Sequence, residues 1–292
     1  MISTLISGVA YGVPLFLVAS GLTLIYGVIG VLNFAHGSFF VVGALIAATL
    51  IGSSVPSIPA FLLAILAGTA VVTALGLVTE STVVRRLYRR DHITMLLATF
   101  AVLLIVEGAA EVIWGNTPRS IDKPTALSGS IQVLGATIPV YDAMLVVVGA
   151  LIAVGLFLLI NKSRFGRGVR AVAQDQTMGE AVGLNTKAVM LLVFGIGSAL
   201  AGLAGALIAP NVSVSPGLGH AFILQSFAIV IIGGLGSVTG SLVAALIVGV
   251  SEAFAVAYMP FLTGFTFYIL VAAVLLIRPR GLLGSAKLGR AA

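Results

Sequence analysis

Three acidic side chains lie within long apolar stretches of this sequence, and they are the first candidates for chemistry. Glu107, Glu111 and Glu252 each interrupt a run of hydrophobic residues. Carboxyl groups inside a membrane can belong to proton relays or ion sites, and they can also form structural pairs. All three are expected toward one end of an apolar stretch, where they can reach the membrane surface or pair with Arg119 and Lys123. We therefore favour a structural or docking role over proton transfer.

Other patterns that would support catalysis do not occur in the sequence. It contains no G-x-x-x-x-G-K-[ST] phosphate loop, so the chain is not expected to hydrolyse nucleotide itself. It has no G-x-S-x-G or H-E-x-x-H pattern, and His36, His92 and His220 are isolated from one another. Because it has no cysteine, thiol catalysis and Cys-based metal sites are excluded. The sequence predicts a protein without catalytic residues, metal or cofactor.

The elements that position these residues are apolar helices. The 292 residues are 60% hydrophobic and 8% charged and include 35 glycines, a composition unsuited to a soluble domain. Nine long apolar segments predict an all-α, polytopic membrane bundle of about eight to ten transmembrane helices, in one domain over residues 1–292. The segments are 2–29, 31–51, 58–79, 93–113, 141–160, 187–209, 221–233, 239–257 and 261–277.

The positive charge gives an orientation. Thirteen of the fifteen Lys and Arg residues fall into three clusters, and cytoplasmic loops of membrane proteins are enriched in these residues. Counting spans from the clusters predicts an outside N-terminus, a cytoplasmic C-terminus and an outward loop at 114–140. Because the charge is spread over loops rather than one patch, no nucleic acid partner is expected. The clusters are Arg85, Arg86, Arg89 and Arg90; Lys162, Arg164, Arg167, Arg170 and Lys187; and Arg278, Arg280, Lys287 and Arg290.

Two glycine-rich breaks interrupt the apolar helices, one over residues 33–38 between the first two segments and one over residues 233–241 between the seventh and eighth. Broken helices are tolerated at membrane depth only where protein or a water-filled cavity surrounds the backbone. Their corresponding places in two sets of four segments indicate an inverted internal repeat and a central pathway. The residues assigned to a pathway or hinge are Asn33, His36, Gly37, Ser38, Gly233, Gly234, Gly236 and Ser237.

Asn33 and His36 have a second interpretation. Asn33 can cap the following helix by accepting a hydrogen bond from a freed backbone N–H, with His36 satisfied by backbone. The two roles are compatible.

Small residues recur every four positions in the sixth segment. They form a face that lets helices approach closely. We expect packing rather than substrate contact from these residues, which include Gly197, Ser198, Gly202 and Gly205.

The longest polar inner loop covers residues 161–187, and it is expected to contain a short helix around 169–179. It resembles the coupling segment of ABC-importer permeases, in which Glu-Ala-Ala is followed by Gly. Here Glu180, Ala181 and Gly183 match, and Val182 replaces the second Ala. A solvated basic loop is the alternative. The resemblance implies that the loop docks on an ATPase, and the candidate coupling residues are Arg170, Asp175, Glu180, Ala181 and Gly183.

Three longer stretches, residues 24–45, 166–207 and 233–246, resemble the branched-chain amino acid permease subfamily, in particular its shorter permease subunit. The resemblance implies transport of leucine, isoleucine, valine or other neutral apolar amino acids across the bacterial inner membrane. It also implies as partners two ATP-binding cassette subunits, a second permease and an external binding protein. The alternatives are a related permease for urea or short amides, an ion-coupled secondary transporter, and a channel or small-solute facilitator.

Overall fold

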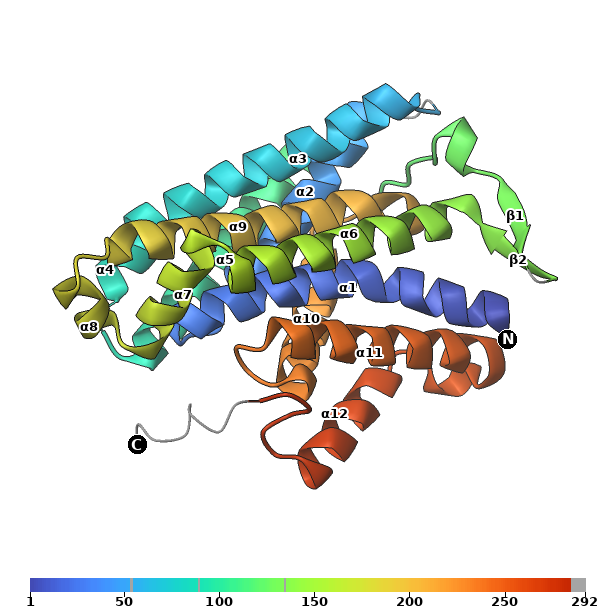
Figure 1. Ribbon diagram of the computed structural model, residues 1–292. Coiled ribbons are helices and arrows are strands. Elements are labelled where there is room, and N and C mark those ends of the chain that lie inside the picture. Colours follow the sequence, from blue (N-terminus) through green and yellow to red (C-terminus); the bar gives the residue numbers. More distant parts are fainter. Residues whose placement is uncertain (53–54, 89, 134, 285–292) are drawn as a thin grey trace.

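The computed structural model describes residues 1–52, 55–88, 90–133 and 135–284, and these form a helical bundle (Figure 1). Each of the nine expected apolar segments contains one helix. Arg89, Lys287 and Arg290 of the basic clusters lie outside the described residues. The apolar helices are α1 (Ile2–Ile29), α2 (Ala35–Ile51), α3 (Ile58–Thr79), α5 (His92–Trp114), α6 (Val140–Lys162), α9 (Thr186–Ile208), α10 (Leu218–Gly233), α11 (Val238–Tyr258) and α12 (Thr266–Ile277).

Six of these helices are long and apolar enough to cross a membrane, so the prediction of a polytopic helical bundle is confirmed. Helices α2, α10 and α12 are shorter. Helix α12 begins at Thr266 rather than at 261. The reason is local, because Pro260–Leu262 form a 3-10 turn and Gly264 has a left-handed φ of 82°.

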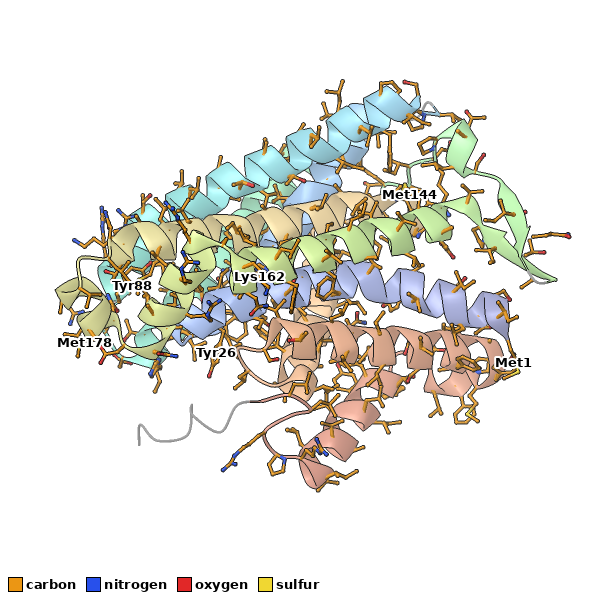
Figure 2. The ribbon with its side chains drawn as sticks, in the orientation of Figure 1. Met1, Tyr26, Tyr88, Met144, Lys162 and Met178 are labelled. Carbon is orange, nitrogen blue, oxygen red and sulfur yellow. The ribbon has the colours of Figure 1, made fainter. Side chains whose placement is uncertain are left out.

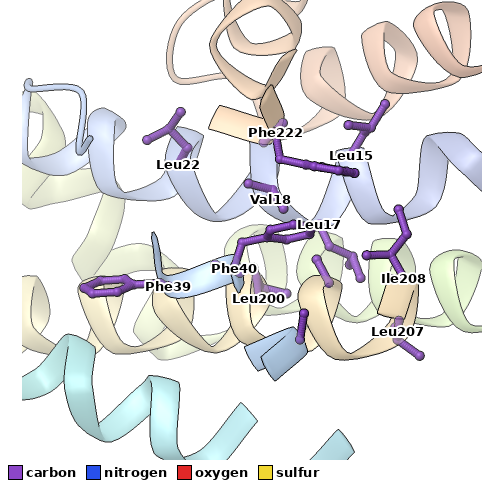
Figure 3. Close-up of a cluster of buried hydrophobic side chains, with 14 of the residues drawn as sticks. Leu15, Leu17, Val18, Leu22, Phe39, Phe40, Leu200, Leu207, Ile208 and Phe222 are labelled. Carbon is purple, nitrogen blue, oxygen red and sulfur yellow. The ribbon is translucent and has the colours of Figure 1, made fainter. Parts of the chain in front are cut away.

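Helices α1 and α9 lie antiparallel at the centre of the bundle (Figure 1), and most of their side chains are buried. Gly21 and Gly197 let the two backbones approach, since a Cβ on Gly21 would lie 2.6 Å from the Gly197 carbonyl oxygen. Around this contact, apolar side chains of α1, α2, α9 and α10 pack together (Figure 3). Helix α6, in contrast, is mostly exposed along its apolar length, as expected for a helix facing lipid.

The small residues of α9 lie against three neighbouring helices. Gly197 approaches α1, Gly202 approaches both α2 and α3, and Gly205 lies against the Phe40 carbonyl group of α2. The buried hydroxyl of Ser198 donates to the Phe194 carbonyl oxygen at 2.8 Å, on the side facing α3. The backbones therefore approach closely where the sequence places small side chains.

Helix contacts support the predicted inverted repeat. Two quartets, α1–α2–α3–α5 and α9–α10–α11–α12, are separated by α6. Helix α1 packs on α11 as α9 packs on α3, and α2 packs on α9 as α10 packs on α1. The pairs α2 with α3 and α2 with α5 correspond in the same way to α10 with α11 and α10 with α12. Because α1 and α9 run in opposite directions, the two quartets are inverted relative to each other.

Polar residues fix where several helices begin. A side-chain oxygen before each helix accepts a hydrogen bond from a freed backbone N–H, which stabilises the first turn. The capping residues are Asp91 of α5, Ser163 of α7 (Arg164–Gln174), Asp175 of α8 (Gln176–Ala181), Asn185 of α9 and Ser237 of α11.

The two ends of the bundle differ in charge. Tyr88, Lys162 and Met178 lie at one end, and Met1 lies at the other (Figure 2). The α3–α5 connection, with the short helix α4 (Arg85–Leu87), shares the first end with α7 and α8. The opposite end carries an antiparallel hairpin of β1 (Ser130–Val133) and β2 (Ala136–Pro139). Two basic segments far apart in sequence therefore meet at one end.

Candidate functional site

The first break is a short non-helical segment between α1 and α2. It covers residues 30–34 rather than 33–38, since α2 already begins at Ala35. His36, Gly37 and Ser38 thus belong to the first turn of α2. The His36 Nε2 lies 3.1 Å from the carbonyl oxygen of Val18, in the middle of the 28-residue α1. Helix α2 therefore starts about halfway across the bundle.

Side chains satisfy much of the freed backbone at this helix start. The Asn33 Oδ1 accepts from the Ala35 N–H at 3.1 Å, and Thr99 Oγ1 accepts from the Phe34 N–H at 3.3 Å. Because His36 Nε2 faces a carbonyl group, that nitrogen carries the proton. Asn33 thus accepts from a freed N–H as the capping interpretation predicts, although Phe34 holds the N-cap position. Asn33 and His36 are both buried.

The second break, predicted over 233–241, is shorter in the structure and covers residues 234–237. Gly234 and Gly236 have φ values of 98° and 81°, which favour glycine. Gly233 ends α10 and lies against Gly240 in α11, while the Ser237 Oγ accepts from the Gly240 N–H at 3.1 Å. The chain after α12 closes this turn, because the Leu283 N–H donates to the Gly233 carbonyl oxygen at 3.0 Å.

A cavity of about 560 Å³ opens beside the second break. Gly236, Ser237 and Thr239 line it together with Thr23 of α1 and Arg170 of α7, and α6 forms another wall. The residues assigned to the first break do not line this cavity. The two sets of predicted pathway residues are therefore not brought together around one cavity in this chain.

The predicted coupling segment folds as α7 followed by α8, in place of one helix around 169–179. Asp175 separates them and its carboxylate accepts from the Met178 N–H at 2.9 Å. The carboxylate of Glu180 accepts from the Thr186 hydroxyl at 2.7 Å, which ties α8 to the first residue of α9. The Arg170 guanidinium donates to the Ile160 carbonyl oxygen at the end of α6. Asp175, Glu180 and Arg170 thus hold the segment together.

Gly183 ends α8 in a left-handed conformation, with φ at 84°. Its N–H bonds to the Glu180 carbonyl oxygen, and the Leu184 N–H bonds to that of Gly179, both at 3.0 Å. These two bonds form a Schellman motif. Glycine is favoured at its left-handed position, because a Cβ there would be strained. The Glu-Ala-Val-Gly match therefore has a structural basis in the end of α8.

Two exposed apolar side chains of this segment were missed by the sequence interpretation. The exposed fractions are 61% for Met178 and 69% for Val182, although both lie at the polar, basic end of the bundle. The exposed residue Ala181 lies beside Val182. Exposed apolar side chains on an otherwise polar segment, such as Met178 and Val182, are a candidate contact for another protein. The signal in the sequence was the replacement of the second Ala by the larger Val182.

Glu80 was also missed. It is fully buried in a turn of π-helix, Glu80–Val84, at the end of α3. Its carboxylate accepts from Arg85 at 2.8 Å and 3.2 Å and from the Tyr88 hydroxyl at 2.6 Å. Burial, and then the bond to Glu80, raise the pKa of Tyr88, so its hydroxyl stays protonated and donates. A charge directly before a basic cluster was the available signal.

The acidic residues within the spans have partners other than those expected. Glu107 lies 3.1 Å from His220 Nδ1, and the Glu252 carboxylate accepts from the Gly264 N–H at 2.8 Å. Arg119 instead donates to the Trp114 carbonyl oxygen, and Lys123 lies over the ring of Tyr141. Of the two possibilities given by the sequence, Glu107 and Glu252 thus have these other partners in place of Arg119 and Lys123, and access to the membrane surface stays a prediction. Glu111 is exposed near the C-terminal end of α5.

Within the described residues, no three His, Asp or Glu side chains are grouped as a metal site would require. The polar groups of the candidate site cap helices, fix turns and hold connecting segments in place.

Comparison with known proteins gives the family. Residues 4–278 match the family described as branched-chain amino acid transport system / permease component. The chain is 33% identical to the high-affinity branched-chain amino acid transport system permease protein BraD of Pseudomonas aeruginosa, over 96% of this chain and 94% of BraD. It is 30% identical to the probable branched-chain amino acid transport permease protein LivH of Methanocaldococcus jannaschii, over 94% of this chain and 90% of that protein.

A more distant relative is the ribose import permease protein RbsC of Escherichia coli, 25% identical over 80% of this chain and 71% of RbsC. No solved structure matches the chain. The family match covers nearly the full length of the nine apolar helices, and the chain covers 94% of BraD. This multi-pass membrane protein therefore belongs to the family of permease components of branched-chain amino acid transport systems.

Proposed function

We propose that this chain is the membrane-spanning permease subunit of a binding-protein-dependent ABC importer for branched-chain or other neutral apolar amino acids. The observation that carries the proposal is near full-length similarity to permeases of branched-chain amino acid transport systems. In this role the chain conducts the substrate, and separate ATPase subunits hydrolyse ATP.

The partners follow from the same role. Two ATP-binding cassette subunits, a second permease chain and an external substrate-binding protein complete the importer. The α7–α8 segment is the proposed ATPase contact, since it lies at the basic end of the bundle and exposes Met178 and Val182. The short Asp175-capped helix α8 is held to α9 through Glu180, so movement of an ATPase against α8 reaches the centre of the bundle.

The proposed location is the inner membrane of a bacterial cell, with the N-terminus outside and the C-terminus in the cytoplasm. The support is that the α3–α5 connection and α7 share one end of the bundle. Arg85, Arg86, Arg164 and Arg167 are in these elements, and positive charge of this kind stays on the cytoplasmic side.

Reconstitution tests the function. The chain is purified with its native ATPases and second permease, placed in liposomes with the binding protein, and supplied with radiolabelled leucine. Uptake that needs internal ATP and persists with a protonophore is expected. Uptake that runs without ATP and collapses with the ion gradient would identify an ion-coupled transporter instead.

Substrate choice is tested in the same liposomes by competition. Excess leucine, isoleucine or valine is expected to abolish uptake, whereas urea, acetamide and ribose leave it unchanged. Ribose is included because RbsC is a relative of this chain. Competition by urea or acetamide, with none by valine, would favour a short-amide permease.

A further inference from the structure

We propose that Glu107 and His220 line the outer half of the substrate path, on the face of this chain that lies against the second permease. The inference rests on the proposed function, because it assigns a place and a role within the same importer. The pair joins α5 to the start of α10 through the 3.1 Å contact between the Glu107 carboxylate and His220 Nδ1.

The pair lies well inside the apolar part of the bundle. Glu107 is seven residues before the end of α5 at Trp114, which is about 10 Å along the helix. His220 follows Gly219, which packs on Gly37, and the neighbouring His36 contacts the middle of α1. The pair is therefore too deep to be assigned to the polar headgroups on position alone.

The exposed fractions of the two side chains show whether the pair lies in the interior of this chain or on its surface. The His220 side chain is 53% exposed, and that of Glu107 is 16% exposed. A charged side chain facing hydrocarbon near mid-membrane costs about 3 kcal/mol or more, so such groups face a protein interior or a water-filled cavity. Because this pair is open on the surface of the chain, the surface beside it faces water and another protein chain rather than lipid alone.

The surroundings connect this surface to the first break. Phe34 lies in the break, between Phe100 of α5 and Phe227 of α10, with ring centroids 5.9 Å and 5.1 Å away. The helices follow the order α5, α2, α10, α12, so both halves of the repeat meet beside the pair. The face therefore includes the place where the two inverted quartets contact each other.

Polar groups continue from the pair to the outer end. The segment before α10 forms an antiparallel bridge to the outer loop, with Arg119 and Val214 exchanging backbone hydrogen bonds of 2.9 Å and 2.8 Å. Next to it, the exposed Ser120 and Ser213 hydroxyls lie 3.2 Å apart. A solute arriving from outside thus meets exposed polar groups before it reaches His220.

The pair suits a zwitterion without holding it strongly. The carboxylate attracts an ammonium group, and the half-exposed imidazole can hydrogen-bond a carboxylate. Since Glu107 and His220 also satisfy each other, neither presents an isolated charge that would trap the substrate. We therefore expect a transient contact with the ammonium and carboxylate groups that all neutral amino acids share.

Cysteine labelling of the assembled complex tests the location. His220→Cys and Ala221→Cys are made in this naturally Cys-free chain, and a charged, membrane-impermeant thiol reagent is added from outside. Leu151→Cys on α6 is the control, because Leu151 is 67% exposed near the middle of that helix. Ala221→Cys preserves the Glu107–His220 contact and keeps the test valid where His220→Cys assembles poorly.

We expect labelling at 220 or 221 to be about tenfold faster than at 151, since charged reagents do not enter hydrocarbon. Excess leucine with the binding protein should slow it. Equal, slow labelling at all three positions would overturn the proposed location. Fast labelling in a complex that does not transport leucine would instead preserve the location and contradict the proposed function.

Transport kinetics test the role. Glu107→Gln should lower the maximal uptake rate several-fold, whereas Glu252→Gln should leave it unchanged. Glu252 is a matched control, because it lies six residues before the end of α11 and faces different helices. Unchanged uptake by Glu107→Gln would show that the carboxylate has no part in the path.

Discussion

Gly37 and Gly219 pack against each other's backbone at the point where α2 and α10 begin. A Cβ on either glycine would lie 2.8 Å from the carbonyl oxygen of the other. The contact is reciprocal, as expected for two elements related by a two-fold inverted repeat. It holds the starts of α2 and α10 together where the two halves of the chain meet. The effect of adding a side chain at either glycine can therefore be predicted.

Gly37→Val is therefore expected to force α2 and α10 apart and to destabilise the bundle by about 1–3 kcal/mol, as overpacking commonly does. Thermal unfolding of the purified complex measures this, together with leucine uptake. Gly155→Val is the control, because no atom lies within 4 Å of the corresponding Cβ position on α6. Equal melting temperatures for the two variants would show that the bundle absorbs the added side chain.

Gly183 has open space around it but a left-handed backbone. Gly183→Ala should cost about 1 kcal/mol, because a Cβ is strained in this conformation. Asn tolerates it better, so Gly183→Asn should preserve more of the coupling between ATP hydrolysis and uptake. The measurement is the ratio of ATP hydrolysed to leucine transported.

Gly179→Ala is the matched control, since its Cβ would make only ordinary contacts of 3.7 Å or more. If Gly183→Asn and Gly183→Ala uncouple the transporter equally, the left-handed turn is not what matters at this position.

Glu80 is expected to be a stabilising residue at the end of α3. Glu80→Ala removes the acceptor for Arg85 and for the Tyr88 hydroxyl and should lower the melting temperature of the protein, because the partly buried Tyr88 hydroxyl then loses its hydrogen-bond partner. Glu80→Gln should destabilise the protein less than Glu80→Ala, since the amide oxygen of Gln can still accept a hydrogen bond from the Tyr88 hydroxyl. Thermal unfolding of both variants and of Arg85→Gln, combined as a double-mutant cycle, gives the coupling. A coupling near zero would contradict the assigned pair.

Met178 is expected to contribute to ATPase binding. Met178→Glu should weaken capture of the ATPase subunits by about tenfold or more, because a charge enters an apolar contact. Gln174→Glu adds the same charge at another exposed position of the segment and should have little effect. Capture on immobilised permease at fixed salt measures the difference. An equal loss in both variants would indicate a general charge effect.

The proposed orientation predicts opposite accessibility for two positions. Val182→Cys should react with an impermeant thiol reagent only from the cytoplasmic side, and Ser128→Cys only from outside. Labelling in intact cells and in inverted vesicles makes the comparison. Reaction of Val182→Cys in intact cells would reverse the topology.

The sequence was sufficient for the helices but not for the geometry of the breaks. Long apolar runs locate α1, α3 and α6 closely, since a membrane-spanning helix needs little beyond length and hydrophobicity. The sequence predicts a break over residues 33–38, because glycine permits backbone geometry that a Cβ would oppose. At Gly37 it instead permits a close helix contact, which depends on Gly219, 182 residues later.

The candidate coupling residues show the same limit. The Glu180-to-Gly183 motif was found because it is local, and its Schellman bonds are local as well. The pair of Glu107 with His220 and the burial of Glu80 depend on tertiary packing. No spacing rule in the sequence brings residues 107 and 220 together, so the contact between them could not be predicted.

The hydrogen bonds from Leu282 and Leu283 to the end of α10 have a consequence for synthesis. The carbonyl groups of Ile232 and Gly233 receive these bonds from residues 50 positions later in the chain. Residues 282 and 283 are synthesised after α11 and α12, so these two hydrogen bonds cannot form before both of those helices have been made. Gly236 and Ser237 line the cavity beside the second break. This wall of the cavity is thus completed only after every apolar helix has been synthesised.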